Sequence, residues 1–541
     1  MKIPRFIACL TALLCMAAGC RSEDDAAVRA LARRIIPEHE KQFRFERLTD
    51  TTECFELESR GSKIVVRGNS SASIAVGLNH YLKNYCLTTV SWHACNPVEM
   101  PAVLPRIDEK VRVESRARER FFLNYCTFGY TMPWWGWTEW ERFIDWMALQ
   151  GVTMPLAITG QEAVWQRVWT RLGLSDEEVR AYFTGPAHLP WHRMSNIDRW
   201  QGPLPEEWID GQLALQQRIL ARERELGMKP VLPAFAGHVP QELKRLHPDA
   251  RITRVSYWGG FDDRYRCSFL DPMDPLFAVI QREFLTEQTR LFGTGHIYGA
   301  DPFNEIDAPT WDPETLAGMS RHIYESMAEV DPEAVWLQMG WLFYADPTHW
   351  TAENIRAFLG AVPQDRLLML DYFCEFTEIW KQTEKFHGQP YLWCYLGNFG
   401  GNTMLSGNFH TVSARMEDAF AHGGDNLRGV GSTLEGFGVN QFMYEFVLDK
   451  AWNTGIADDE WIARLADRRT GFRDPAARTG WRTLCDSVYT LPAQTGQSPL
   501  TNAHPALEGN WHWTTKPTTG YRFPTLWRVW EELLAVDSER D

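Results

Sequence analysis

The first part of the chain alternates between helix-like and strand-like apolar patterns at short intervals. Residues 26–36 and 71–85 carry apolar side chains at helical spacing. Residues 41–48, 53–59 and 62–67 have the composition of short strands. Residues 103–113 alternate between apolar and polar side chains and are bounded by prolines, as a final strand or a linker would be. This pattern predicts a small α/β domain over residues 21–115, without a catalytic feature.

From about residue 116, short apolar runs alternate with segments of helical periodicity. The eight apolar runs are residues 120–125, 152–158, 229–235, 296–300, 334–339, 366–371, 389–395 and 427–434. The helical segments are residues 138–150, 205–227, 275–292, 313–330 and 412–422, with two shorter ones at 351–359 and 376–385. Buried strands that alternate with helices form parallel sheets, and eight repeats predict a (β/α)₈ barrel over residues 116–455. A doubly wound sheet is the alternative, but no G-x-G-x-x-G motif follows an early strand.

The last part of the chain is predicted to be helical. Residues 440–452 would form the final barrel helix, and residues 458–470, 480–489 and 525–536 also have helical periodicity. The apolar residues beyond the barrel are too few for a full core. We therefore expect residues 456–541 to form a short, incomplete, all-helical C-terminal region.

The N-terminus has the layout of an export signal. Lys2 and Arg5 precede the apolar run of residues 6–16, which is too short to span a bilayer. Small residues then lead directly to Cys20 and resemble a bacterial lipobox. We expect residues 1–20 to be a lipoprotein signal peptide, with Cys20 lipidated and the protein in the bacterial cell envelope, in the periplasm or on the outer-membrane surface. The lipid anchor would be its only membrane contact, and plain secretion is the alternative.

Composition limits the classes of function. The formal net charge of −15 argues against a nucleic-acid partner. The eight cysteines outside the leader form no C-x-x-C pair and no zinc-like spacing, so a metal cluster is not expected, and most should be buried free thiols. No cofactor is expected. The chain holds 25 tryptophans; most fill the core, but tryptophan faces also stack on sugar rings.

Polar residues gather directly after the predicted barrel strands, where barrel enzymes keep their catalytic groups. The acidic candidates at these positions are Glu162, Asp301, Glu305, Asp371, Glu375 and Glu435. Glu305 and Glu435 share one arrangement, an apolar strand followed by a loop that contains the glutamate. Glycoside hydrolysis needs two such carboxyl groups, one protonated and one ionised. For each of the six, a salt bridge or a loop-capping hydrogen bond is the alternative role.

Longer motifs in these loops resemble the α-N-acetylglucosaminidases, glycoside hydrolase family 89. They occur in the family's order: Asn124-Tyr-Cys-Thr, Gly160-Gln-Glu-Ala-Val-Trp-Gln-Arg167, Trp191-His-Arg-Met194, Tyr298-Gly-Ala-Asp-Pro-Phe-Asn-Glu305, Asn398-Phe-Gly-Gly-Asn402 and Glu435-Gly436. The resemblance implies an exo-acting, retaining hydrolase that removes terminal α-linked N-acetylglucosamine, with Glu305 as general acid/base and Glu435 as nucleophile. It also implies sugar contacts from Asn124, Cys126, Trp191, Trp258, Asn304 and Trp341, with Asn304 suited to the sugar 2-substituent.

Several alternatives stay open from the sequence. Relatives carry a longer C-terminal helical domain, so a non-catalytic glycan-binding lipoprotein is one rival. An α-hexosaminidase of different sugar specificity is another. The glycan could be mucin-type or heparan-like, and the negative net charge favours the neutral, mucin-type one. A homo-oligomer is compatible with the sequence.

Overall fold

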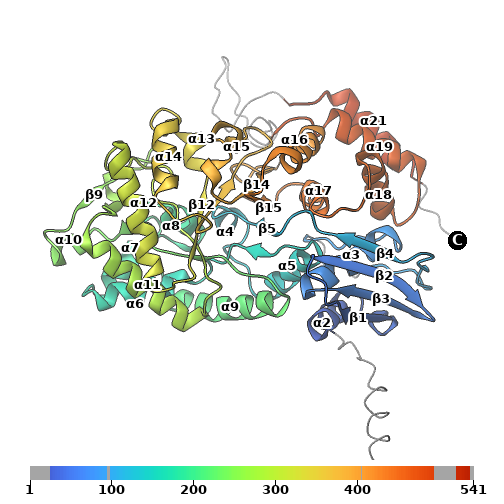
Figure 1. Cartoon of the computed structure of the whole chain (residues 1–541), viewed down its shortest axis with the longest axis horizontal. Helices are drawn as coiled ribbons and strands as arrows, with labels where there is room; N and C mark the ends of the chain where they lie inside the picture. The colour runs from blue at the N-terminus through green and yellow to red at the C-terminus, as the bar shows by residue number, and fades with distance from the viewer. Residues whose placement is uncertain (1–24, 94–97, 404, 493–518, 537–541) are drawn as a thin grey trace, which may run out of the picture.

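The computed structural model describes residues 25–93, 98–403, 405–492 and 519–536. The chain folds into a small N-terminal α/β unit, a large barrel and a C-terminal group of helices (Figure 1). The predicted signal peptide and Cys20 lie outside the described residues. In the part of the chain that is described, no helix has the length and apolar character needed to cross a membrane.

The N-terminal unit is a four-stranded sheet covered by two helices. Its strands have the order β1-β3-β2-β4, and the elements are β1 (Phe43–Arg47), β2 (Cys54–Arg60), β3 (Lys63–Gly68), β4 (Val111–Glu114), α2 (Ala26–Ile35) and α3 (Ser71–Asn84). Ser70 begins α3 with a capping box, its side chain accepting from the backbone N–H of Ser73. The predicted strands and helices are confirmed, although the last strand covers only the end of the segment predicted for it.

Each of the eight predicted apolar runs overlaps a strand of one parallel sheet. The strands are β5 (Glu119–Phe122), β6 (Met154–Pro155), β7 (Leu232–Pro233), β11 (Ile297–Gly299), β12 (Val335–Met339), β13 (Leu367–Asp371), β14 (Tyr391–Tyr395) and β15 (Leu427–Ser432). Their order is β6-β5-β15-β14-β13-β12-β11-β7. The two end strands meet as well, because the Val231 N–H donates to the Pro155 carbonyl oxygen at 2.9 Å and Leu156 forms a parallel bridge with Val231. The sheet therefore closes into the predicted barrel.

Helices surround the barrel. The longer ones are α5 (Trp137–Leu149), α6 (Gln161–Arg171), α7 (Asp176–Tyr182), α9 (Glu206–Glu225), α11 (Pro275–Phe292), α12 (Pro313–Ala328), α14 (Ala352–Gly360), α16 (Phe409–His422) and α17 (Phe442–Lys450). Asp274 and Asp312 cap helices that start with proline, which explains why the starts of α11 and α12 were predictable.

Three features differ from the sequence-based expectation. The helix predicted at residues 376–385 is a single turn, α15 (Ile379–Gln382), because the chain turns sharply through left-handed conformations at residues 384–387. Gln161 and Glu162 were expected in a loop but begin α6, since Gly160 takes a left-handed conformation (φ +69°) that suits the turn into it. A small antiparallel sheet of β8 (His238–Val239), β9 (Ile252–Arg254) and β10 (Ser268–Leu270) lies between β7 and α11 and was not predicted.

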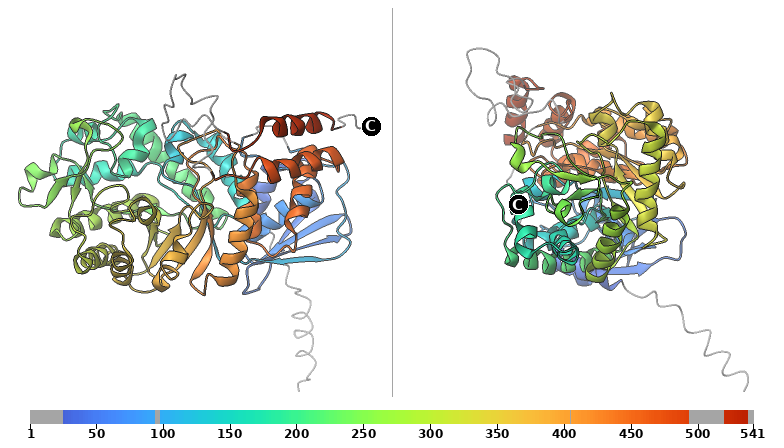
Figure 2. Two further views of the ribbon diagram at one scale, coloured as in Figure 1. Left: turned by 90° about the horizontal axis from the view of Figure 1, so that it is seen from above. Right: turned by 90° about the vertical axis from the view of Figure 1, so that its left-hand side faces the viewer.

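The C-terminal helices are α18 (Asp458–Thr470), α19 (Pro475–Ser487) and α21 (Phe523–Leu534). Figure 2 shows them beside the N-terminal sheet, at the same end of the barrel. Buried Glu445 on α17 anchors them by accepting hydrogen bonds from Arg468 (3.0 Å) and Arg469 (3.4 Å) of α18. The seven cysteines in the described residues are free and buried, as expected, and Cys95 lies outside them.

Candidate active site

A cavity of about 590 Å³ opens where the barrel strands end. The eight residues expected at the site all line it: Asn124, Cys126, Trp191, Trp258, Asn304, Glu305, Trp341 and Glu435. Seven further residues complete its wall: Tyr130, Met194, Gly259, Met339, Tyr372, Phe399 and Gly400. Residues from separate loops, up to 311 positions apart in the sequence between Asn124 and Glu435, therefore share one pocket.

Glu435 follows β15 and lies at the more buried side of the cavity. Its backbone N–H donates to the Asn398 carbonyl oxygen at 3.1 Å, and its Oε2 accepts a short hydrogen bond from the Gly400 N–H. Burial of the carboxyl group, together with the nearby charge of Glu305, raises the pKa of Glu435 from 4.5 to about 7. Glu435 and Glu305 are thus close enough to interact electrostatically across the cavity.

Glu305 lies in the loop after β11 and is more exposed than Glu435. Three N–H groups face its carboxylate. Trp258 Nε1 donates to Oε2 at 2.8 Å, and Trp341 Nε1 lies 3.3 Å from Oε1. The third donor is Asn196 Nδ2, which lies 3.1 Å from Oε2. The carboxylate is held at three points, which fixes its orientation at the cavity wall.

Aromatic side chains form the apolar walls of the cavity. Trp191 packs edge-to-face against Tyr130, with ring centroids 5.1 Å apart. Trp341 lies 6.0 Å from both the Tyr372 and the Phe399 rings. A side chain at Gly129 would meet the Trp191 ring at 2.8 Å, so only glycine fits beneath it. Such walls suit the apolar C–H faces of a sugar ring.

The two asparagines of the cavity wall differ in whether the side-chain oxygen has a hydrogen-bond partner. Asn124 Nδ2 donates to the Thr433 carbonyl oxygen at 2.8 Å and its Oδ1 accepts from the Cys126 N–H at 2.9 Å, so it joins the first and last strand-end loops. Asn304 is 6% exposed, and its Oδ1 is buried without a hydrogen-bond partner. Asn304 Oδ1 is therefore an acceptor that no group among the described residues satisfies.

The other four acidic candidates have structural partners and do not line this cavity. Glu162 forms a two-point ion pair with Arg193, with both N–O distances 2.8 Å. Asp301, Asp371 and Glu375 accept hydrogen bonds from backbone N–H groups. Of the six acidic residues that follow strands, only Glu305 and Glu435 face the pocket.

Within the described residues, two groups have the composition of metal sites, and neither lines the cavity. One is His192, Asp198 and His238; the other is Asp307, Asp346 and His349. In the first group, His238 Nε2 lies 2.8 Å from Asp198 Oδ1, as expected of a hydrogen-bonded core histidine.

The sequence did not single out Tyr130, Met194, Asn196, Tyr372, Phe399 or Gly400 as site residues. Asn196 and Met194 belong to a segment inserted after α7, away from the ends of the barrel strands, where the sequence predicts the site residues. Only the motif around Trp191 indicated that this segment belongs near the site.

Comparison with known proteins gives concordant results along the chain. The family model described as alpha-N-acetylglucosaminidase (NAGLU) tim-barrel domain matches residues 120–454. The N-terminal and C-terminal domain models of the same name match residues 26–106 and 461–541. The alpha-N-acetylglucosaminidase of Homo sapiens is 41% identical over 508 residues, covering 91% of this chain and 68% of that protein.

Solved structures with the same fold include a family 89 glycoside hydrolase from Clostridium perfringens in complex with 2-acetamido-1,2-dideoxynojirmycin. It has a TM-score of 0.85 and 28% identity, covering 93% of this chain and 57% of its own. A variant of the Clostridium perfringens enzyme with two glutamate-to-glutamine substitutions, in complex with its substrate GlcNAc-α-1,4-galactose, gives a TM-score of 0.84 at 28% identity and covers 94% and 57% of the two chains. The chain thus spans little more than half the length of these solved relatives.

Proposed function

Because the chain belongs to the α-N-acetylglucosaminidases of glycoside hydrolase family 89, we propose that it hydrolyses terminal, non-reducing, α-linked N-acetylglucosamine from glycans with retention of configuration. The observation that carries this proposal is the strand-end cavity in which Glu305 and Glu435 are the paired carboxyl groups among aromatic walls. Retaining glycosidases place two carboxyl groups on opposite sides of the scissile bond.

Glu435 is assigned as the nucleophile and Glu305 as the general acid/base. Glu435 lies on the more buried side, where it can attack the anomeric carbon from behind. Glu305 is exposed, on the side where a leaving group can depart to solvent. Glu305 gives its proton to the glycosidic oxygen as Glu435 forms the glycosyl-enzyme. It then takes a proton from the water that hydrolyses this intermediate.

Substrate chemistry supports an enzymic nucleophile. In an α-linked N-acetylglucosaminide the 2-acetamido group is cis to the leaving group, so it cannot attack the anomeric carbon from the opposite face. A second carboxylate must therefore form the covalent intermediate. The two glutamate-to-glutamine substitutions in the Clostridium perfringens substrate complex accord with a two-carboxylate mechanism in that relative.

Release of p-nitrophenol from p-nitrophenyl α-N-acetylglucosaminide by the purified chain tests the proposal. The matched β-glucosaminide should be inert, because its 2-acetamido and leaving groups are differently placed. A folded chain that releases no p-nitrophenol from the α-linked substrate would contradict the enzymatic function and favour a glycan-binding protein.

The acid limb of the pH–rate profile should lie near neutrality. Glu435 must be ionised to attack, and its pKa of about 7 means that the competent fraction grows as the pH rises toward 7. Well below pH 7, kcat/KM should change by about tenfold per pH unit. The measurement is kcat/KM from pH 4 to 9 on an activated substrate; a profile that is flat between pH 5 and 7 contradicts the expectation.

Asn304→Ala should weaken recognition of the 2-acetamido group. The unpartnered Oδ1 of Asn304 can accept the N–H of that group, and a lost hydrogen bond of this kind costs about 1–2 kcal/mol. We expect kcat/KM for p-nitrophenyl α-N-acetylglucosaminide to fall by about tenfold or more, with little change for p-nitrophenyl α-glucoside. An equal loss on both substrates would show that Asn304 does not read the 2-substituent.

Neutral glycans should be preferred to anionic ones. The described residues that line the cavity include two glutamates and no lysine or arginine. The arginines of the loop that carries Trp258 include two with acidic partners in that loop: Arg266 pairs with Asp263, and Arg264 with Asp262. An anionic sugar would thus face carboxylates without a compensating cation. We expect a higher kcat/KM for GlcNAc-α-1,4-galactose than for GlcNAc-α-1,4-glucuronate, and the reverse order would contradict this.

A lipid anchor at Cys20 in the bacterial cell envelope remains part of the proposal and rests on the sequence of the leader. Incorporation of labelled palmitate that is lost in Cys20→Ser would support it, and labelling that persists in Cys20→Ser would contradict it.

A further inference from the structure

The hydrogen bonds to Glu305 are unequally divided between its two oxygens. Oε2 accepts from both Asn196 Nδ2 (3.1 Å) and Trp258 Nε1 (2.8 Å), whereas Oε1 has only the Trp341 N–H at 3.3 Å. An oxygen that already accepts two N–H bonds is the poorer site for a proton, because the proton would have to point away from both donors. The proton of the neutral acid is therefore favoured on Oε1.

We propose that Asn196 is a positioning residue for Glu305, which keeps Oε2 as a permanent acceptor and leaves Oε1 to deliver the proton. This inference rests on the proposed function. In the glycosylation step the proton passes from Oε1 to the glycosidic oxygen as the bond to the anomeric carbon breaks. That oxygen keeps the bonding electron pair, and the negative charge remains on the Glu305 carboxylate. The Asn196 N–H stabilises this charge as it develops.

Asn196 is the donor best suited to remain in place throughout the reaction. It is 2% exposed, and its backbone N–H donates to the Trp191 carbonyl oxygen at 2.8 Å. The residue before it, Ser195, takes a left-handed conformation (φ +64°) that turns Asn196 toward Glu305. By contrast, Trp258 is only partly buried, beside exposed Gly259, and is itself an expected sugar contact. Sugar binding can displace its N–H but not that of Asn196.

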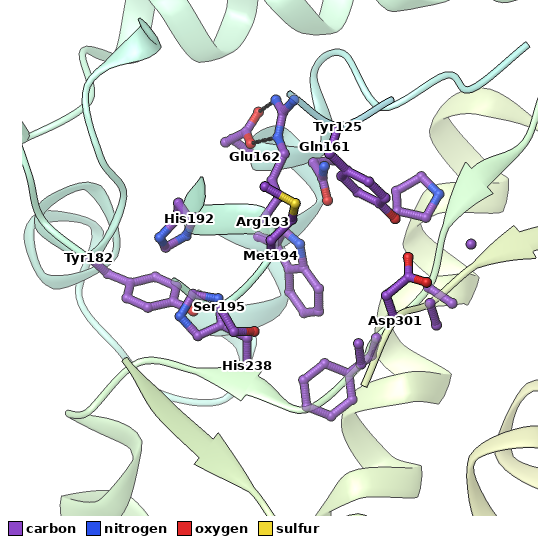
Figure 3. Close-up of a pocket in the computed structure, with 17 residues that line it drawn as sticks. Tyr125, Gln161, Glu162, Tyr182, His192, Arg193, Met194, Ser195, His238 and Asp301 are labelled. Atoms are coloured by element: carbon purple, nitrogen blue, oxygen red, sulfur yellow. Dashed lines mark hydrogen bonds and ion pairs between the residues drawn. The ribbon is translucent and has the colours of Figure 1, made fainter. Parts of the chain in front are cut away.

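Buried polar side chains hold the segment of Asn196 on both sides. Before it, Arg193 is bound at two points by Glu162 of α6. Around it, Asp198 Oδ1 lies 2.8 Å from His238 Nε2 and 3.1 Å from His192 Nδ1. Figure 3 shows the Arg193 guanidinium facing Glu162, with His192 and His238 farther along the wall of a small cavity of about 50 Å³ that this segment lines.

The carboxylate of Asp198 in this support stays ionised over the working pH range. Burial tends to raise the pKa of Asp198, but the charges and hydrogen bonds of His238 and His192 outweigh it and lower the pKa to about 2. Asp198 therefore stays ionised, hydrogen-bonded to His238 and within 3.1 Å of His192 Nδ1. The support acts through Asn196, since neither histidine lines the catalytic cavity.

The test compares leaving groups in Asn196→Ala. The value of kcat/KM reports on the glycosylation step. It should depend strongly on general-acid assistance for a substrate with a poor leaving group, and only weakly for an activated aryl glycoside. For GlcNAc-α-1,4-galactose we expect a loss of about 10- to 100-fold, as for a hydrogen bond to a charged group. For p-nitrophenyl α-N-acetylglucosaminide the expected loss is about threefold or less. Asn354→Ala is the matched control: Asn354 is also buried and donates to a backbone carbonyl, that of His349, but lies on α14 away from the cavity.

Equal losses on both substrates would overturn the positioning role while leaving the proposed function intact. Absence of turnover by the parent chain on either substrate would overturn both. If Asn196→Ala does not fold, Asn196→Asp carries the same test, since it keeps the shape but replaces the N–H donor with a carboxylate. His238→Gln should also reduce kcat/KM more for GlcNAc-α-1,4-galactose than for p-nitrophenyl α-N-acetylglucosaminide, but by smaller factors. This substitution loosens the segment that carries Asn196 without removing the Asn196 N–H donor.

Discussion

Replacing Glu435 by glutamine is expected to reduce kcat by a factor on the order of 10⁵, because the reaction then lacks the group that forms the covalent intermediate. Glutamine keeps the shape of the side chain and an oxygen to accept the Gly400 N–H, so the pocket should stay intact. Substrate should still bind, since the aromatic walls and Asn304 are unchanged. The measurement is single-turnover kinetics on p-nitrophenyl α-N-acetylglucosaminide, together with the dissociation constant of N-acetylglucosamine.

Glu375→Gln is the matched control for this variant. Glu375 is also a buried glutamate after a barrel strand, with a pKa that burial raises to about 7. It accepts hydrogen bonds from the N–H groups of Leu396 and Gly397 in the loop that also supplies Gly400. It does not line the cavity. The folded Glu375→Gln protein should keep most of its turnover. Loss of activity to the same degree in both variants would show that the effect on Glu435 is structural.

Replacing Glu305 by alanine should reduce kcat/KM by about 10²- to 10⁴-fold on GlcNAc-α-1,4-galactose, the usual contribution of a general acid. The loss on an activated aryl glycoside should be smaller, and the glycosyl-enzyme should accumulate because its hydrolysis lacks the base. Added azide can attack that intermediate and give an α-glycosyl azide of retained configuration. In Glu435→Ala, azide should instead replace the nucleophile and give the β-azide. The opposite pairing of products would show that the two roles are exchanged.

The barrel was predictable because its strands are buried on both faces. Leu367–Asp371 and Tyr391–Tyr395 are buried at every position, and such continuous apolar runs stand out from their surroundings. Glu305 and Glu435 were accessible to prediction for the same reason, since each follows a strand whose end can be located. The start of α6 could not be predicted in this way. Its first turn after Gly160 is polar and resembles a loop until the backbone conformation is known.

Selection among the acidic residues required the structure. Glu162 and Glu305 have similar sequence settings, yet one is paired with Arg193 and the other faces the cavity. That difference depends on tertiary packing of the inserted segment that carries Arg193. The same segment brings Asn196 to Glu305, a contact across 109 residues that no local pattern encodes. Asn124 lines the pocket as expected. The structure adds that its side-chain amide also bonds to the backbone of two loops, which the sequence did not indicate.

The most direct measurement is ¹H NMR of the sugar released from GlcNAc-α-1,4-galactose in the first minutes of hydrolysis by the unmodified protein. Two carboxyl groups acting through a glycosyl-enzyme require that α-N-acetylglucosamine appears first and then mutarotates to the β-anomer. Initial appearance of the β-anomer would mean single displacement by water and would contradict the nucleophilic role of Glu435.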